Sequence, residues 1–233
     1  MSLEQRITTD LKTAMKAKDK VALRGIRAIK SAILLAKTDG SGSTLDEAGE
    51  VKMLQASFGI SKPFDPEHRL YDVKLAGGAL LDVGIYPITF AQMILQETPN
   101  EISASAHIGP SHVDESNAMT FKYENGVIAS LNSSITTKTS HEAWIYGTKG
   151  NIKIPSFWHP QTAQLNTDIT DESVTIEHVI NGYEYEIEEV HKCLEAQLLE
   201  SPKMSWESSK TIMKIMDEVR SQIGLKYPNE ASS

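Results

Sequence analysis

Two side chains that could transfer protons, Asp82 and Tyr86, lie four residues apart in the apolar, glycine-rich segment 77–87. Residues i and i+4 share one face of a helix, so the carboxylate and the phenol are expected to point the same way. An acid and a phenol that converge in a pocket are candidates for general acid–base chemistry. The alternative is structural, because an Asp near a helix start is favoured by the helix dipole and a Tyr in an apolar helix often packs in the core.

The elements that must position this pair follow from the hydrophobic pattern around it. Residues 77–96 are mostly apolar and predict a buried helix, which Gly84 and Pro87 are expected to bend or interrupt. Residues 56–76 show no clear period and contain prolines, so an irregular connection is predicted there. The candidate pair is thus expected on an interrupted helix that follows a loop.

After this helix the hydrophobic period changes to two, which is typical of strands with one buried face. Strands are predicted at 102–108, 119–123, 127–135, 142–147, 151–154, 162–169 and 173–179. Asn125 and Gly126 predict a type I′ hairpin turn between two of them.

Two helices are predicted at the end of the chain, at 183–199 and 206–223. Ser205 is the expected N-cap of the second helix, and Gly224 suits the position after its end. Strands and helices together predict an α+β fold, in which an open, mainly antiparallel sheet is flanked by helices.

The first forty residues differ from the rest in charge. They carry nine Lys/Arg against four Asp/Glu, a net charge of +5, whereas the remainder carries fourteen against twenty-seven, or −13. Residues 2–37 predict an N-terminal helical hairpin, and a capping box at Thr44 predicts a further short helix toward Leu54. The basic residues are interpreted as a solvated face, with a nucleic-acid surface as the alternative.

Composition limits the class of protein. The chain has 233 residues, 40% of them hydrophobic and 23% charged, which is ordinary for a soluble globular protein. No apolar run in the sequence reaches the roughly eighteen residues of a membrane span. Cys193 is the single cysteine, so an internal disulfide framework is excluded and a cytoplasmic location is expected.

Four stretches together resemble one known family. They are Phe64–Leu70, Gly77–Pro87, Glu142–Gly150 and Gly182–Glu186. Through them, residues 56–228 resemble the C-terminal domain of the Gfo/Idh/MocA oxidoreductases, in particular the dihydrodiol-dehydrogenase-like branch.

The resemblance implies hydride transfer between NAD or NADP and a sugar, polyol or diol. It implies that Tyr86 is the acid/base at the substrate hydroxyl and that Asp82 positions the substrate or tunes that proton. Trp158 is a candidate for lining the pocket, with simple packing as the alternative. Because the sheet of this domain often forms the dimer interface, homo-oligomerisation through the sheet is also expected.

The same family normally begins with a Rossmann domain, for which the sequence gives no fingerprint. Near residues 40–42, Leu45 stands where a third glycine belongs, and the segment follows a predicted helix instead of a strand. Lys62-Pro63 lacks the preceding Glu of the family's Glu-Lys-Pro motif, which supplies a catalytic lysine. We therefore expect no cofactor to bind this chain alone, and no catalysis without a nucleotide-binding domain.

Metal motifs are incomplete. His141 begins an H-E-x-x-H pattern, but Ile145 replaces the second His. A metal site at His107, His112 and Asp114 is not favoured, because these residues lie around a predicted loop.

Residues 1–55 resemble a different family. The stretches Met1–Gln5, Ala14–Lys20 and Leu23–Lys30 are similar to the start of YqeY proteins, which are related to the tail domain of the GatB amidotransferase subunit. The chain is therefore predicted to be a chimera joined near Gln55/Ala56. This resemblance provides the rival functional hypothesis, a tRNA- or amidotransferase-associated binding module, whereas no membrane partner is expected.

Overall fold

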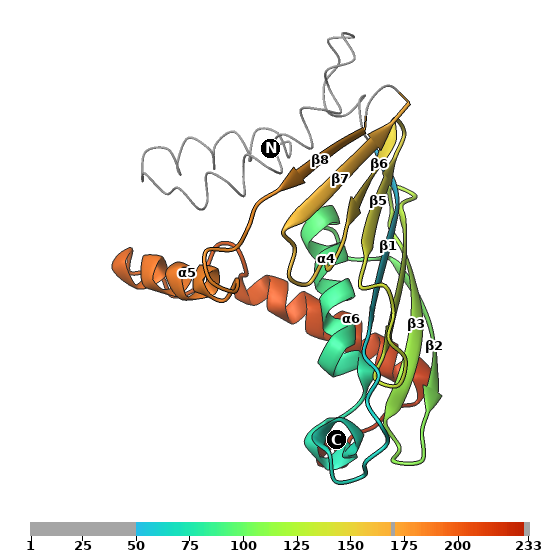
Figure 1. Cartoon of the computed structure of the whole chain (residues 1–233). Coiled ribbons are helices and arrows are strands. Elements are labelled where there is room, and N and C mark those ends of the chain that lie inside the picture. Colours follow the sequence, from blue (N-terminus) through green and yellow to red (C-terminus); the bar gives the residue numbers. More distant parts are fainter. Residues whose placement is uncertain (1–49, 169–170, 231–233) are drawn as a thin grey trace. The chain divides into compact units, whose positions relative to one another are not determined.

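The computed structural model describes residues 50–168 and 171–230 and shows a mixed sheet of eight strands with a few helices (Figure 1). The strand order is β2-β3-β4-β1-β5-β6-β7-β8. The chain divides into two compact units. The predictions for the N-terminal hairpin, for the helix start at Thr44 and for residues 40–42 lie outside the described residues.

The larger unit comprises residues 52–144, 156–158 and 200–233. Its strands are β1 (Val51–Gly59), β2 (Glu101–Ile108), β3 (Asp114–Lys122) and β4 (Ile128–Ser134). β2, β3 and β4 pair antiparallel, and β1 pairs parallel with β4, placing Leu54 beside Ala129. The sheet is mainly antiparallel, as the sequence predicts.

Helices cover one face of this part of the sheet. α4 (Ile85–Leu95) packs on β4, and α6 (Trp206–Ile223) packs on α4 and β2. The core between them consists of alternate strand residues and one stripe of each helix, including Leu54, Met119, Phe121, Leu131, Ile88, Met216 and Val219. Ser205 caps α6 through the Ser208 N–H, and Gly224 follows its end with φ of 72°, as predicted.

Short helical elements precede α4. They are the 3₁₀ helices η1 (Arg69–Tyr71) and η2 (Val73–Leu75) and the π-helix η3 (Leu80–Gly84); a third 3₁₀ helix, η4 (Pro228–Glu230), follows α6. The predicted interruption near Gly84 is therefore a π-helical turn. Pro87 has no N–H to donate to the preceding π-helical turn, and the helix continues past it as α4.

The smaller unit contains β6 (Gly150–Ile154), β7 (Thr162–Thr167), β8 (Asp171–Thr175) and α5 (Glu184–Glu195). The three strands pair antiparallel. β5 (Ala143–Gly147) contributes residues to both units. Cys193 of α5 is buried, consistent with a packing role.

Two local predictions are wrong. Residues 51–59 form β1, although the sequence predicted a helix toward Leu54 followed by an irregular segment; this strand runs through the predicted join near Gln55/Ala56, which stays a prediction. The β3–β4 turn is not type I′, because Gly126 alone has a positive φ, of 84°, whereas that turn needs a positive φ at both central residues. Asn125 instead accepts the Val127 N–H with its side chain.

One helical stretch of the described chain, Val73–Leu95, is long and apolar enough to cross a membrane by length and composition. Half of its most apolar window is buried inside the protein, which is what a core helix gives.

Candidate active site

Asp82 lies in the π-helix η3 and is paired with Arg69 from η1. The Arg69 guanidinium donates to the carboxylate with an Nη1–Oδ1 distance of 2.6 Å. The Asp82 side chain is 20% exposed and that of Arg69 is 64% exposed, so the pair lies at the surface. An exposed pair of this kind contributes little to stability, about 0–1 kcal/mol, and the exposed guanidinium has further N–H groups that can donate to an added polar group.

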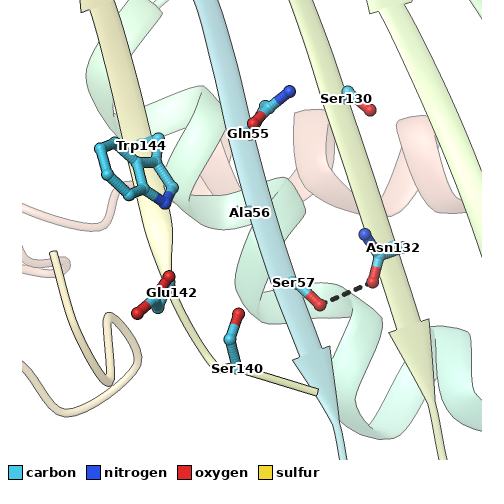
Figure 2. A pocket seen from close by; sticks show the side chains of 8 residues that line it. All are labelled: Gln55, Ala56, Ser57, Ser130, Asn132, Ser140, Glu142 and Trp144. Atoms are coloured by element: carbon cyan, nitrogen blue, oxygen red, sulfur yellow. Dashed lines mark hydrogen bonds between the residues drawn. The ribbon is translucent and has the colours of Figure 1, made fainter. Parts of the chain in front are cut away.

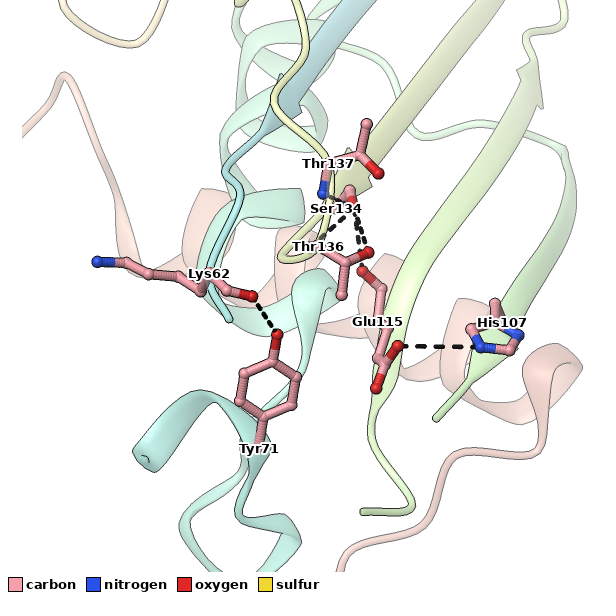
Figure 3. A network of polar contacts seen from close by, with 7 residues as sticks. All are labelled: Lys62, Tyr71, His107, Glu115, Ser134, Thr136 and Thr137. Carbon is pink, nitrogen blue, oxygen red and sulfur yellow. Dashed lines mark hydrogen bonds and ion pairs between the residues drawn. The ribbon is translucent and has the colours of Figure 1, made fainter. Parts of the chain in front are cut away.

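The turn that carries Arg69 is fixed by its neighbour Tyr71 (Figure 3). The buried Tyr71 hydroxyl donates to the carbonyl oxygen of Lys62 at 2.7 Å, which ties η1 to the segment after β1. Burial, and then the charge of Glu115, raise the pKa of Tyr71, so the phenol stays a donor.

A second turn, at the end of β4, is fixed by Ser134. The Ser134 hydroxyl oxygen accepts the backbone N–H groups of residues 136 and 137.

Tyr86 lies at the start of α4, where its ring forms part of an aromatic wall. Its ring packs edge-on against Phe58 of β1, with 5.0 Å between centroids. Phe58 is buried, stacks on Trp158 at 5.3 Å and 11°, and also meets Phe157 and His141 edge-on. Tyr86 and Trp158 are each 42% exposed, so the wall presents a phenol and an indole to solvent.

His141 contacts other parts of this site through both ring nitrogens. Nε2 lies 2.6 Å from the carbonyl oxygen of Gly59, and Nδ1 lies 3.4 Å from the indole nitrogen of Trp158. A carbonyl can only accept and an indole N–H can only donate, so these contacts use Nε2 of His141 as a donor and Nδ1 as an acceptor. Its role is therefore to orient Trp158 against Phe58.

Two glycines before η3, Gly77 and Gly78, allow the backbone to lie close to other buried atoms. Gly78 has φ of 117°, and a Cβ there would lie 2.2 Å from Oδ1 of Asp114. A Cβ on Gly77 would lie 2.6 Å from the Arg69 carbonyl oxygen. Both positions require glycine, and they bring η1 and η3 together so that Arg69 reaches Asp82.

The structure places the two predicted site residues on consecutive elements, Asp82 in η3 and Tyr86 in α4. The carboxylate bonds to Arg69, and the phenol packs on Phe58. A π-helical turn changes the angular step per residue, so the simple i, i+4 argument does not carry over to this pair. Trp158 lies in the same wall as Tyr86, where it stacks on Phe58, and its role in lining a pocket stays a prediction.

Other sequence motifs have structural roles. Asp114 is buried against η3, and His107 lies 3.9 Å from Glu115. Within the described part of the chain, no three His, Cys, Asp or Glu side chains are grouped closely enough to hold a metal ion.

Sequence reasoning missed Arg69, Phe58 and His141 as members of this site. Arg69 lies in the stretch Phe64–Leu70, which carries the family resemblance but no local signal for a site, and His141 stands in an incomplete metal motif. The signal that could identify Phe58 is the alternation along residues 54–58, where Leu54, Ala56 and Phe58 are buried.

Comparisons with known proteins identify the family and the fold. Residues 45–153 match the profile of the GFO/IDH/MocA C-terminal domain, and residues 4–59 match that of a Yqey-like protein. The two matches overlap at residues 45–59. Both predicted resemblances are confirmed.

Two curated relatives carry the same name. The chain is 37% identical over 191 residues to trans-1,2-dihydrobenzene-1,2-diol dehydrogenase of Danio rerio, covering 78% of this chain and 57% of the relative. The Homo sapiens protein of that name is 30% identical over 190 residues, which cover 78% of this chain and 56% of the relative. The chain thus spans little more than half the length of these relatives.

Solved structures share the fold. KijD10, a 3-ketoreductase from Actinomadura kijaniata in complex with NADP and TDP-benzene, matches with a TM-score of 0.65 and 21% identity, covering 75% of this chain and 55% of that one. Aldose-aldose oxidoreductase from Caulobacter crescentus, complexed with glycerol, matches with a TM-score of 0.68 and 16% identity. The match covers 86% of this chain and 63% of that one.

Proposed function

We propose that this chain supplies the substrate-facing part of an NAD(P)-dependent dehydrogenase that acts on a sugar, polyol or diol. The observation that carries the proposal is the half-exposed phenol of Tyr86 in an aromatic wall, on the helix that follows the Asp82–Arg69 pair. The names of the relatives support the reaction class, and the resemblance of segment 77–87 supports the choice of residues.

In this proposal Tyr86 moves the proton. A hydroxyl that is oxidised loses a proton from oxygen and a hydride from carbon, and the phenol oxygen of Tyr86 is the acid/base at that oxygen. The nicotinamide, when bound, accepts the hydride. The exposed indole of Trp158, backed by the buried Phe58, provides an apolar surface for the carbon skeleton, and Arg69 with Asp82 offers polar groups for a second hydroxyl.

The proposal requires a nucleotide-binding domain besides the residues that the structure describes. We expect the chain alone to bind neither NAD(H) nor NADP(H), and to be inactive alone. Calorimetric titration of the purified chain with each cofactor at millimolar concentration tests this. Heat of binding that saturates would show a nucleotide site and would overturn the expectation of an inactive chain.

Self-association through the uncovered sheet face is the second part of the proposal. The residues of β1 and β4 that point away from the helices are exposed or half-buried. They include two apolar residues, Met53 and Ile128, which are 38% and 39% exposed. Beside them lies a shallow hollow of about 260 Å³ lined by Gln55, Ala56, Ser57, Ser130, Asn132, Ser140, Glu142 and Trp144 (Figure 2). Apolar groups rimmed by polar ones are typical of a protein interface.

Sedimentation velocity tests this surface. The chain is expected to sediment as a dimer at micromolar concentration, and Ser130→Arg is expected to shift it to monomer, because a cation would be buried in the interface without a partner. Ser221→Arg, at an exposed position of α6, is the control. A wild-type chain that remains monomeric at every concentration contradicts the proposal.

The Yqey-like match at residues 4–59 supports a second candidate function, a tRNA- or amidotransferase-associated binding module. Nine Lys/Arg among the first forty residues give it an electrostatic basis. Full-length chain is expected to retain tRNA at low salt and to release it as salt rises. No retention at low salt would eliminate this function.

A further inference from the structure

Asp114, the first residue of β3, is a carboxylate with 0% exposure. Its Oδ2 accepts two hydrogen bonds, one from the backbone N–H of Leu80 and one from the side-chain amide of Asn117, both at 2.8 Å. Burying an ionisable group is costly unless it is well bonded, so this arrangement has a structural or functional purpose.

The bond to Leu80 caps the element that carries Asp82. The first N–H groups of a helix have no partner within the helix, and η3 has no capping side chain at its own N-cap residue, Ala79. Asp114 supplies that acceptor from a strand 34 residues away. The start of η3 is therefore fixed by a residue of the sheet, Asp114, because no residue within the helix caps it.

The second carboxylate oxygen of Asp114, Oδ1, constrains the two glycines that precede η3. Oδ1 lies against Gly78, where a Cβ would come within 2.2 Å, and it has no hydrogen-bond partner among the described residues. Tyr227, from the segment after α6, donates its hydroxyl to the carbonyl of Gly77 at 2.9 Å. The two glycines are thus held between a carboxylate and a phenol.

A polar row continues from Asp114 to the end of η3. Ser133 of β4 donates to the side-chain carbonyl of Asn117 at 3.0 Å. A Cβ on Gly84, the last residue of η3, would lie 2.9 Å from the Ser133 hydroxyl oxygen. Three buried polar residues, Asp114, Asn117 and Ser133, therefore contact both ends of the π-helical turn.

We propose that Asp114 is a positioning residue for the proton-transfer site, which fixes the start of η3 and thereby the places of Asp82 and Tyr86. The proposal rests on the proposed function for the meaning of those two residues, but the geometry that it asserts can be measured without any activity. Asp114 itself touches no substrate and acts through the backbone of Leu80.

A pair of substitutions separates positioning from general stability. Asp114→Ala removes the acceptor. Asp114→Asn retains it, because both donors converge on one oxygen and the Asn carbonyl can take that place. Amide hydrogen exchange and side-chain NMR signals are measured on the full chain, and the Leu131 amide in β4 serves as the internal reference.

Asp114→Ala is expected to speed exchange at Leu80 at least tenfold while exchange at Leu131 changes less than twofold. The Asp82 carboxyl carbon and the Tyr86 ring signals are expected to shift, and Asp114→Asn is expected to restore all three readouts. Equal acceleration at Leu80 and Leu131, or unmoved Asp82 and Tyr86 signals, would overturn the proposal.

Asn117→Ala provides a second arm in case Asp114→Ala does not fold. It removes one of the two donors to Oδ2 and leaves the bond from Leu80. A smaller acceleration at Leu80 with the same direction of shift at Asp82 is expected, and no shift at Asp82 would count against the proposal. Because no readout is catalytic, a failed dehydrogenase assay would refute the proposed function and leave this result standing.

Discussion

The ionisation of Asp114 should make the protein less stable as pH rises. Desolvation raises the pKa of this carboxyl from 3.8 to about 6, against the lowering effect of hydrogen bonds from Asn117 and Leu80. A folded-state pKa above the unfolded one means that the folded chain binds more protons between these values. The stabilising contribution is complete below pH 3.8 and is lost as pH rises through about 6.

The size of the effect follows from the two pKa values. The difference between 3.8 and about 6 corresponds to about 3 kcal/mol over the whole range. Between pH 5 and pH 8 the linkage relation gives a loss of about 1.4 kcal/mol from this group. Asp114→Asn mimics the neutral acid and should lack this loss, because an amide does not titrate.

Urea denaturation at pH 5 and pH 8 measures the effect as a double difference. The free energy of unfolding of wild type minus that of Asp114→Asn should fall by about 1.4 kcal/mol from pH 5 to pH 8. Asp168→Asn, which changes an exposed carboxylate after β7, is the matched control for the substitution chemistry. A double difference below about 0.3 kcal/mol for Asp114→Asn would refute the reasoning, since the carboxyl would then titrate alike in both states.

Three further predictions concern single residues. Phe58→Ala should lower the free energy of unfolding by about 3–5 kcal/mol in urea, because the ring is buried among four others, whereas Met53→Ala on the same strand should cost about 1 kcal/mol or less. Gly78→Ala should cost more than Gly126→Ala in the same assay, since both glycines have positive φ but a Cβ meets another atom only at position 78; equal losses would contradict this. Desolvation raises the pKa of Glu184, but three backbone N–H groups ahead of it outweigh this and lower the pKa to about 2. Its contribution to stability should therefore be present above pH 4.5 and be lost as pH falls through about 2, and an NMR titration that gives Glu184 a midpoint near 4.5 would contradict it.

Much of the fold could be predicted because it depends on local patterns. The strands β2, β3 and β4 follow the period-two alternation, and α6 lies between the predicted Ser205 and Gly224. β1 was missed because only residues 54–58 alternate in burial, and its neighbour in the sheet, β4, lies about seventy residues further along the chain. A parallel pairing of that kind leaves no signal in a short window of sequence.

The site was predictable only in part, for a physical reason. Asp82 and Tyr86 share one short segment, so their residue types and spacing are visible in the sequence. Phe58 reaches Tyr86 from β1, and Arg69 reaches Asp82 from η1 through a turn that needs Gly77, Gly78 and a buried carboxylate on β3. Such long-range contacts are set by tertiary packing, and no local pattern predicts them.

The central claim is that Tyr86 transfers the proton in a dehydrogenase completed by a nucleotide-binding domain. It is tested most directly by mixing the chain with the part of the Danio rerio relative that this chain does not match, and following reduction of NAD and of NADP with a trans-1,2-dihydrodiol as substrate. The account predicts no turnover by the chain alone, turnover on mixing, and a loss of about 100-fold or more with Tyr86→Phe. No turnover on mixing, or turnover that Tyr86→Phe leaves unchanged, would contradict it.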